Sequence, residues 1–453
     1  MQQKNTFQYV PLLIIHLLIG SGIFFIPFLS KIYAILIFIV GFIYVVKTQN
    51  KNNEVLLVCG YIVGSEVLIR STDGAFLYEF AKYGTMFFVF IGMFYSGFSK
   101  NAIPFWMYII LLIPGVLIGV FSLTGLYEIR NSISNTISGP ACLGVVALYT
   151  YQRKIHISNL NTILLAVGLP ILSHLTYIIL FNPSVKDVIT GTDSSGITSG
   201  GFGPNQVSTI LGLGIFIYFS RIILQSKNNF NIILNLFIIA IFAFRSIVTF
   251  SRGGVFTAIV MIVILTLNLY FLTSSKGKFK LNFLIIILLM GSVFIWVYSS
   301  IQTNGLIQKR YNNQDAAGRV KESKMSGRED LVKSEMNMFF DNPVLGVGVG
   351  KSIEIRQEQT GLVAASHNEI TRLLAEHGAI GIAILLILFF TPIFLFFDNK
   401  QNIFMFPFLL FWLLTINHAA MRIAAPAFVY GLSLLKVYIN EPQNPQNGRQ
   451  VSD

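Results

Sequence analysis

Long apolar runs recur along almost the whole chain, and they restrict what it can fold into more than any other feature. A run of about 20 apolar residues can cross the hydrocarbon core of a bilayer as a helix. Some of the runs are short enough to be partial or re-entrant, so we predict twelve to fourteen transmembrane helices. The candidate segments are 9–28, 31–46, 54–69, 79–98, 103–122, 138–151, 160–181, 204–224, 230–247, 253–273, 281–300, 378–397, 403–418 and 424–440.

Composition supports the same fold class. Of the 453 residues, 54% are hydrophobic and only 11% are charged, whereas soluble domains carry about 25% charged residues. We therefore predict an all-α polytopic membrane protein with one large helical periplasmic loop. The predicted parts are an N-terminal transmembrane bundle (1–300), an extracytoplasmic loop region with short helices (301–377), C-terminal transmembrane helices (378–440) and a disordered cytoplasmic tail (441–453).

The distribution of lysine and arginine predicts the orientation. Basic residues fall in alternate short loops, and the positive-inside rule makes those loops cytoplasmic. Both termini are then inside, and segments 182–203, 251–254 and 301–377 lie outside. The net charge of +12 has the same explanation, with attraction for a polyanionic lipid substrate as the alternative. Nucleic-acid binding is not indicated, because no basic stripe lies on a soluble domain. The basic residues concerned are Lys47, Lys51, Lys100, Arg153, Lys154, Arg221, Lys227, Lys276, Lys278 and Lys280.

The predicted outer loop carries signals of ordered structure. Ser326 and Glu329 have the spacing of a capping box, which predicts a helix that ends near Asn342-Pro343. The glycine-rich segment 346–352 resembles a phosphate-binding loop, but Leu345 stands where that loop requires glycine. We therefore predict a tight glycine turn there and no nucleotide site.

The segment from Ser366 to Glu369 holds the best candidate for a general base. These two residues have S-x-x-E spacing, which predicts a helix start with His367 in its first turn. The helix dipole disfavours an imidazolium there, and a neutral histidine can accept a proton. His377 is a weaker candidate, and His418 has no supporting neighbours, so we assign it to packing.

Two arginines are candidates for binding an anion. Arg252 follows Ser251 at the outer end of a predicted span, and its adjacent glycines favour close approach by a ligand. Arg245 lies two turns deeper on the same helical face, where a charge is costly unless it faces a cavity or a partner. Interfacial snorkelling and structural roles are the alternatives for this pair.

Other polar residues have competing structural roles. Asn205 and Gln206 could hydrogen-bond a sugar or diphosphate, or cap a helix end. Glu66 and Arg70 have the i, i+4 spacing of an ion pair, which we read as structural. The GxxxG spacings of Gly60 with Gly64 and of Gly115 with Gly119 predict close helix packing. The carboxylates and histidines are dispersed, so no metal site is predicted.

Four segments together resemble a known family. His367-Asn368, Gly378 and Gly381 fit the pattern H-[NSQ]-x9-G-x-x-G of the O-antigen ligase and polymerase superfamily of bacterial membrane glycosyltransferases. The chain is similar to that family also at 203–206, at 251–254, and at Gly327-Arg328 with 342–348. One departure is Phe256, which stands where family ligases often have leucine after the arginine.

The resemblance implies a function and a set of roles. It implies inverting, metal-independent transfer of a glycan from undecaprenyl diphosphate, without a cofactor, at a periplasmic cavity of the bacterial inner membrane. The acceptor would be lipid A-core in a ligase, or a second lipid-linked glycan in a polymerase. A transporter or flippase of lipid-linked saccharide is the alternative; such proteins often contain internal repeats, which the sequence does not show. His367 would be the base, and the substrate-binding residues would be Arg252, Arg245, Arg328, Asn205, Gln206 and Asn368.

Overall fold

The computed structural model describes residues 6–124, 126–321, 328–361 and 366–439, and in these it is almost entirely helical. The exceptions are a 3-10 turn, η1 (Ile197–Ser199), and two short strands, β1 (Lys154–His156) and β2 (Lys436–Tyr438). The helices are α1 (Thr6–Phe25), α2 (Leu29–Thr48), α3 (Glu54–Ser71), α4 (Phe80–Ser96), α5 (Ile103–Ser122), α6 (Leu126–Thr150), α7 (Ile157–Phe181), α8 (Pro204–Leu224), α9 (Asn229–Ile247), α10 (Arg252–Leu272), α11 (Ser275–Gln302), α12 (Leu306–Tyr311), α13 (Arg328–Asp341), α14 (Lys351–Thr360), α15 (Glu369–His377), α16 (Ala379–Asp398), α17 (Met405–Ile416) and α18 (Ala425–Ser433).

Each predicted apolar segment coincides with a helix, which confirms the all-α polytopic class. In the described part of the chain, eight helices are long and apolar enough to cross a membrane, fewer than the twelve to fourteen predicted spans. Part of the difference has a local cause, because α4, α17 and α18 have only 17, 12 and 9 residues. The predicted domain boundaries stay predictions, and the tail 441–453 lies outside the described residues.

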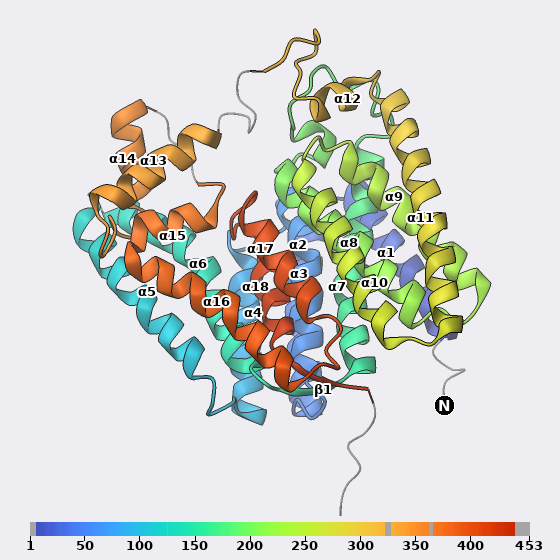
Figure 1. Ribbon diagram of the computed structural model, residues 1–453, viewed down its shortest axis with the longest axis horizontal. Helices are drawn as coiled ribbons and strands as arrows, with labels where there is room; N and C mark the ends of the chain where they lie inside the picture. The colour runs from blue at the N-terminus through green and yellow to red at the C-terminus, as the bar shows by residue number, and fades with distance from the viewer. Residues whose placement is uncertain (1–5, 125, 322–327, 362–365, 440–453) are drawn as a thin grey trace, which may run out of the picture.

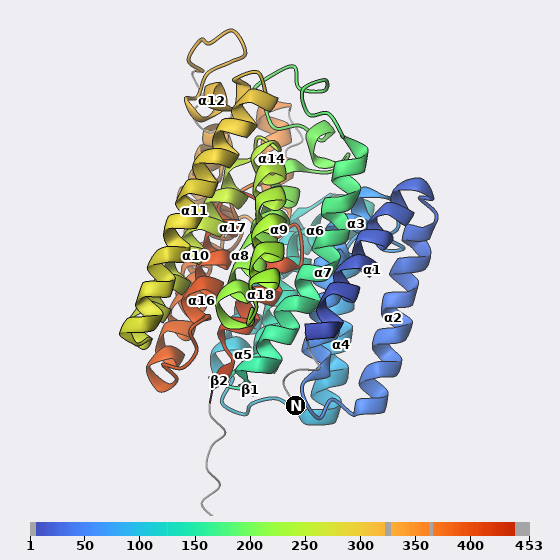
Figure 2. The same cartoon turned by 90° about the vertical axis from the view of Figure 1, so that its right-hand side faces the viewer.

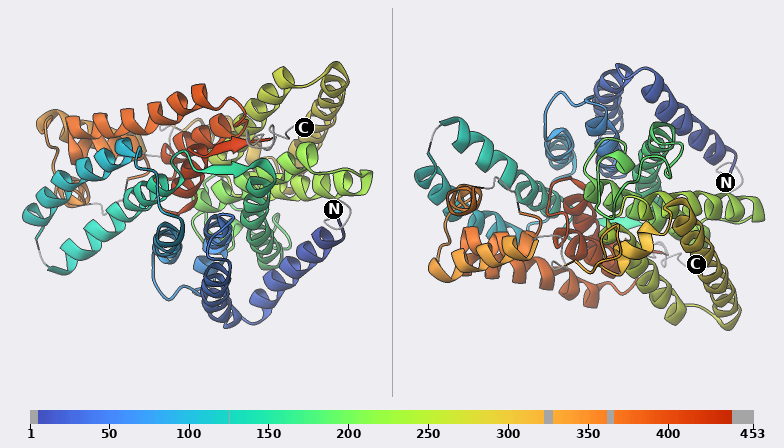
Figure 3. Two further views of the ribbon diagram at one scale, coloured as in Figure 1. Left: turned by 90° about the horizontal axis from the view of Figure 1, so that it is seen from below. Right: turned by 90° about the horizontal axis from the view of Figure 1, so that it is seen from above.

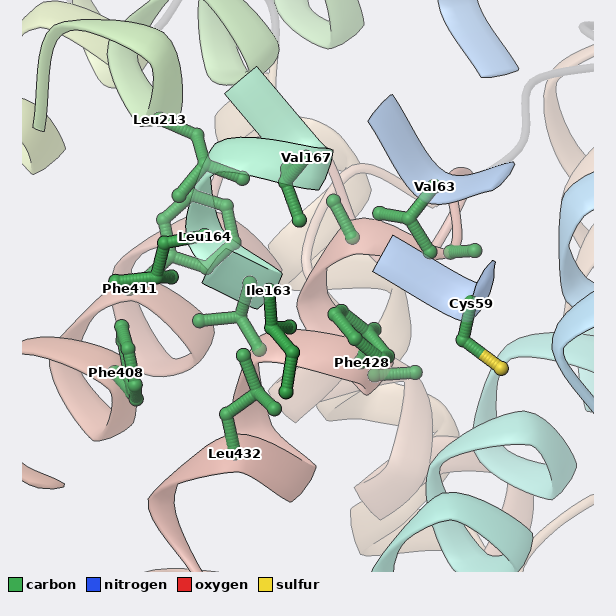
Figure 4. Close-up of a cluster of buried hydrophobic side chains, with 14 of the residues drawn as sticks. Cys59, Val63, Ile163, Leu164, Val167, Leu213, Phe408, Phe411, Phe428 and Leu432 are labelled. Atoms are coloured by element: carbon green, nitrogen blue, oxygen red, sulfur yellow. The ribbon is translucent and has the colours of Figure 1, made fainter. Parts of the chain in front are cut away.

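The short helices α17 and α18 lie at the centre of the bundle. In Figures 1 and 3, α5, α6, α15 and α16 lie on one side of them, and α7 to α11 lie on the other. Helix α17 packs against α10 and α18, and α18 packs against α6. Figure 4 shows part of the apolar core at this centre, where side chains such as Val63, Val167, Leu213, Phe408 and Phe428 meet.

Glycines allow two close helix contacts. A Cβ atom at Gly64 would overlap the carbonyl oxygen of Val167, so the predicted close packing of this GxxxG segment is that of α3 on α7. The second GxxxG segment, on α5, has different neighbours. A Cβ at Gly115 would overlap the ring of His377, and one at Gly119 would overlap the carbonyl of Val349. At Gly115 and Gly119, α5 therefore packs closely against the loop region rather than against another span.

The two ends of the bundle differ in what they carry. At one end β1 pairs in parallel with β2, and Arg153 joins the loops that follow α2, α4 and α6 by hydrogen bonds to Asn53, Ser96 and Gly97. The helices α12 and α14 lie at the opposite end (Figure 2). The basic loops that the sequence predicts to be cytoplasmic therefore lie at the end opposite the large loop region.

Candidate functional site

A cavity of about 740 Å³ opens at the end that carries the loop region. Its wall combines residues that are far apart in the sequence, from before α8 to after α17. Of the predicted site residues, His367, Arg328, Asn205 and Gln206 line it, whereas Arg252, Arg245 and Asn368 do not. The complete lining is Asp193, Ser194, Gly203, Pro204, Asn205, Gln206, Arg310, Lys321, Arg328, Leu331, His367 and Arg422.

The start of α15 differs from the prediction. The N-cap is Asn368, whose side-chain oxygen accepts hydrogen bonds from the backbone N–H groups of Ile370 (2.9 Å) and Thr371 (3.4 Å). The carboxylate of Glu369 pairs with Arg372 instead of reaching back to Ser366. The predicted capping box is therefore wrong, and His367 lies just outside the helix. The predicted substrate-binding residue Asn368 serves as a helix cap, because asparagine is at least as good an N-cap as serine.

His367 is neutral at pH 7, although not for the reason that the sequence suggested. Burial, and after it the charges of Arg422 and Arg328, lower the pKa of its imidazole to about 4. Among the described residues, no group makes a hydrogen bond to its buried Nδ1. The side chain thus presents a neutral imidazole to the cavity, and its Nδ1 has no hydrogen-bond partner within the described chain.

Arg422 holds the backbone next to His367 in place, a role that no sequence pattern indicated. Its guanidinium donates to the carbonyl oxygen of Ser366 (2.8 Å). The backbone around Arg422 is held in turn: Arg70 donates to its carbonyl oxygen (2.8 Å), and Glu66 accepts from the N–H of Ala424 (2.7 Å). The predicted ion pair of Glu66 and Arg70 is confirmed at 3.2 Å. Its role is structural, because it fixes the segment that presents Arg422.

His418 lies against the same site, although its sequence context indicated packing only. Its Nε2 is 3.1 Å from the hydroxyl of Thr209, and its Nδ1 is 2.8 Å from the carbonyl oxygen of Leu414. Arg328 donates weakly to the backbone carbonyl of His418 (3.4 Å). Burial lowers the pKa of His418 to about 4. Both ring nitrogens are engaged, so His418 is the poorer candidate for a base.

Arg252 begins α10, beside the cavity wall. Its positive charge contributes to the lowered pKa values of Arg310 and Arg328, although burial is the largest cause for both. The glycines after it have a packing role, which the sequence interpretation did not include. A Cβ at Gly254 would overlap the backbone of Ser208, and one at Gly253 would overlap the ring of His418. They allow α10 to pack against α8 and the segment after α17.

Arg245 and Asn205, two predicted site residues outside the loop region, have different surroundings. Arg245 lies near the end of α9 and Arg252 begins α10, so the predicted shared helical face of the two arginines is wrong. Arg245 is buried, with its guanidinium over the ring of Phe244, 5.6 Å from the ring centroid. It lies outside the cavity wall. Asn205 lines the cavity and also accepts a hydrogen bond from the hydroxyl of Ser251 (2.8 Å). Asn205 thus joins the start of α8 to the residue before Arg252.

Three residues that the sequence did not single out form an ionic group in the cavity wall. The carboxylate of Asp193, which is 75% exposed, accepts from Lys321 (2.6 Å) and from Arg310 (3.3 Å). Arg310 also donates to the backbone carbonyl of Phe250 (3.2 Å). Asp193 and Lys321 are 128 positions apart, so no local pattern could have joined them.

The glycine-rich segment forms the predicted tight turn. Gly346, Gly348 and Gly350 have φ values of 72°, 94° and 85°, which favour glycine. The N–H of Gly350 and the hydroxyl of Ser352 donate to the same carboxylate oxygen of Glu376, at 3.1 Å and 2.9 Å. The part that resembles a phosphate-binding loop therefore binds a carboxylate of its own chain.

Comparison with known proteins gives one family. Residues 236–386 match the family model described as O-antigen ligase. This range contains Arg252, Arg310, Arg328 and His367, whereas Arg422 lies beyond it. No curated protein matches the chain.

Proposed function

Because the chain belongs to the O-antigen ligase and polymerase superfamily, we propose that it is a membrane glycosyltransferase. The donor is a glycan on undecaprenyl diphosphate. The acceptor is a hydroxyl group on lipid A-core or on a second lipid-linked glycan. Transfer inverts the anomeric centre and needs no metal or cofactor, and His367 is the general base.

One observation carries the proposal: a neutral, half-buried imidazole faces a cavity whose wall also contains arginines. A diphosphate leaving group gains negative charge as its bond to the sugar breaks. Planar guanidinium groups can bind phosphate oxygens in a bidentate manner and stabilise that charge. Arg328 and Arg310 line the cavity and Arg252 lies behind them, so positive charge is concentrated where such a group would bind.

The proposed step conserves atoms and charge. The acceptor oxygen attacks the anomeric carbon from the face opposite the diphosphate, and a new glycosidic bond forms. His367 takes the hydroxyl proton as this bond forms. The bond between the anomeric carbon and the diphosphate oxygen breaks, and its electron pair remains on undecaprenyl diphosphate. The protonated His367 then loses its proton to solvent.

Donor binding should make His367 a stronger base. The charges of Arg422 and Arg328 contribute to the low pKa of the imidazole in the empty cavity. A bound diphosphate would offset those charges and raise the pKa, which improves proton transfer near neutral pH. The same cations would thus bind the leaving group and prevent protonation of the base before the donor arrives.

The side of the membrane can be tested by labelling. We propose that the cavity faces the periplasm, which the concentration of lysine and arginine in the loops at the other end supports. The native Cys59 and Cys142 are both buried, so background labelling should be low. Cysteines placed at Ala317 and at Ser275 should react from outside and from inside, respectively. Reaction of both from one side would contradict the proposed orientation.

Transfer itself is best tested with the purified protein in liposomes. Undecaprenyl-diphosphate-linked glycan would be supplied with lipid A-core in one arm and with a second lipid-linked glycan in the other. Product formation in either arm that persists in EDTA is the expected result, and the productive arm identifies the acceptor. Movement of the lipid across the bilayer without any product would support the flippase alternative instead.

A further inference from the structure

The guanidinium of Arg70, at the cavity end of α3, contacts two aromatic rings. Its central carbon is 4.8 Å from the ring centroid of Tyr78 and 5.1 Å from that of Phe202. The pair with Glu66 and the bond to the carbonyl of Arg422 hold this guanidinium in place. The ring of Tyr78 is therefore fixed from one side by a charged group that cannot move freely.

Tyr78 is also unusually open for an aromatic residue with such a partner. It is 69% exposed, in the segment between α3 and α4. Phe76, two residues earlier, is 54% exposed, but its ring packs against those of Phe38 and Phe80. Phe76 has the surroundings of an interfacial aromatic that contacts lipid. Tyr78 differs, because its ring lies against a polar group that is connected to the cavity.

Two connections place Tyr78 at the rim of the cavity. Phe202, the second ring that contacts Arg70, directly precedes the lining residues Gly203 and Pro204. Arg70 itself donates to the backbone of Arg422, whose side chain lines the cavity beside His367. Tyr78 therefore contacts Arg70, and Arg70 in turn contacts two segments that adjoin the cavity, at Phe202 and at Arg422.

We propose that Tyr78 is a saccharide subsite, where a pyranose ring of the substrate glycan stacks on the phenol ring. A pyranose has an apolar face of C–H groups, and an aromatic ring presents a flat face of negative potential that attracts them. An exposed, fixed ring costs little entropy when it binds such a face. The inference rests on the proposed function, because it places sugar units at a distance from the transferred bond.

The test uses the protein in liposomes and two probes. One probe is the undecaprenyl-diphosphate-linked glycan of the organism that makes this protein, and the other is the oligosaccharide that mild acid releases from it. Tyr78→Ala should weaken oligosaccharide binding about tenfold and raise KM for the lipid-linked glycan by a similar factor, with kcat unchanged. Tyr78→Phe and Tyr78→Trp should bind as the wild type does, because they retain the ring. Phe76→Ala is the matched control in the same segment and should leave binding unchanged.

Three outcomes would overturn the subsite. The first is unchanged oligosaccharide binding by Tyr78→Ala, and the second is a Tyr78→Phe variant as weak as Tyr78→Ala. The third is a lower kcat at unchanged KM, which would mean that Tyr78 acts through Arg70 on the position of Arg422. A wild-type protein that binds the oligosaccharide but forms no product would count against the proposed function alone.

Discussion

Arginines of the cavity wall and of the loop region have opposite electrostatic surroundings. In the cavity, burial and neighbouring arginines lower the pKa values of Arg328 and Arg310. In the loop region, burial would also lower the pKa of Arg372, but Glu369 and Glu376 more than offset it and raise the pKa. The charges that act on Arg328 are thus those of other arginines, whereas Arg372 lies among carboxylates.

This difference in electrostatic surroundings distinguishes the cavity, which we expect to bind an anion, from the loop region, where the charges stabilise the fold. Helices α13, α14 and α15 with the glycine turn 346–350 form a unit that we call the cap. Its buried carboxylates are matched by partners, such as Glu335 with Arg356 at 2.9 Å and with the hydroxyl of Thr371 at 2.5 Å. Clustered like charges reduce stability, and a site that binds an anion recovers this cost when the anion arrives.

Removal of the base should have the largest effect. His367→Ala should lower kcat by about 10²- to 10⁴-fold, the scale of a lost general base, while the amount of folded protein stays normal. Single-turnover transfer in liposomes measures this. His377→Ala is the comparison within the cap: its ring packs against Gly115, so it should lower stability more than turnover. Turnover by His367→Ala within a fewfold of the wild type would remove His367 from the mechanism.

Loss of a cap carboxylate should mainly destabilise the protein. Glu376→Gln removes one partner of Arg372 and the charged acceptor for Gly350 and Ser352. We expect a loss of about 3 kcal/mol in unfolding free energy, as for a broken buried ion pair. Thermal unfolding in detergent would show it, and the remaining folded protein should transfer glycan nearly normally. A stable but inactive Glu376→Gln would contradict the assignment of the cap to stability and of the cavity to transfer.

Loss of a cavity arginine should have the opposite pattern. Arg328→Gln should lower kcat/KM by about 10²-fold, because one group that stabilises the leaving diphosphate is gone. Its unfolding temperature should be unchanged or higher, since repulsion with Arg422 and Arg252 is relieved. Parallel unfolding and transfer measurements on one preparation check this. An unfolding temperature that falls with activity would assign Arg328 to the structural group.

Geometry should matter as well as charge at the start of α10. Arg252→Lys keeps the charge but loses the planar fork, so we expect at least about a tenfold loss of kcat/KM. Arg245→Lys should be milder, because Arg245 lies outside the cavity wall. EDTA should alter neither result. Equal activity of Arg252→Lys and the wild type would show that the positive charge at this position is sufficient and that the planar shape of the guanidinium is not needed.

The smallest effect is a shift of the pH profile. His367 has a lowered pKa of about 4, so it stays neutral, and the acid limb of kcat/KM should fall near that pH. Arg422→Gln removes one cause of the lowering, so the pKa should rise and the limb should move upward by about one pH unit. Activity of wild type and variant from pH 4 to 8 measures it. A limb that moves downward or stays in place would mean that the field of Arg422 does not set the protonation of His367.

The sequence by itself determined the fold class and the chemistry that is available. Apolar runs of spanning length leave helices as the viable structure in a bilayer, and each predicted run contains a helix. Local spacing was enough for the pair of Glu66 and Arg70, the close packing at Gly64, the end of α13 and the glycine turn. These features depend on residues a few positions apart, so pattern reading can reach them. The capping box predicted at Ser326 lies outside the described residues.

Only the tertiary structure decided which residues share the cavity. Arg422 is 56 positions from the Ser366 carbonyl that it binds, and Lys321 is 128 positions from Asp193. Sequence spacing carries no information about such contacts, because they depend on how separate helices pack. The same holds for the protonation of His367. The sequence placed it at a helix start, whereas burial and arginines from distant segments keep it neutral. A pKa depends on the charges and the solvent within a few ångströms, and these are fixed only when the chain is folded.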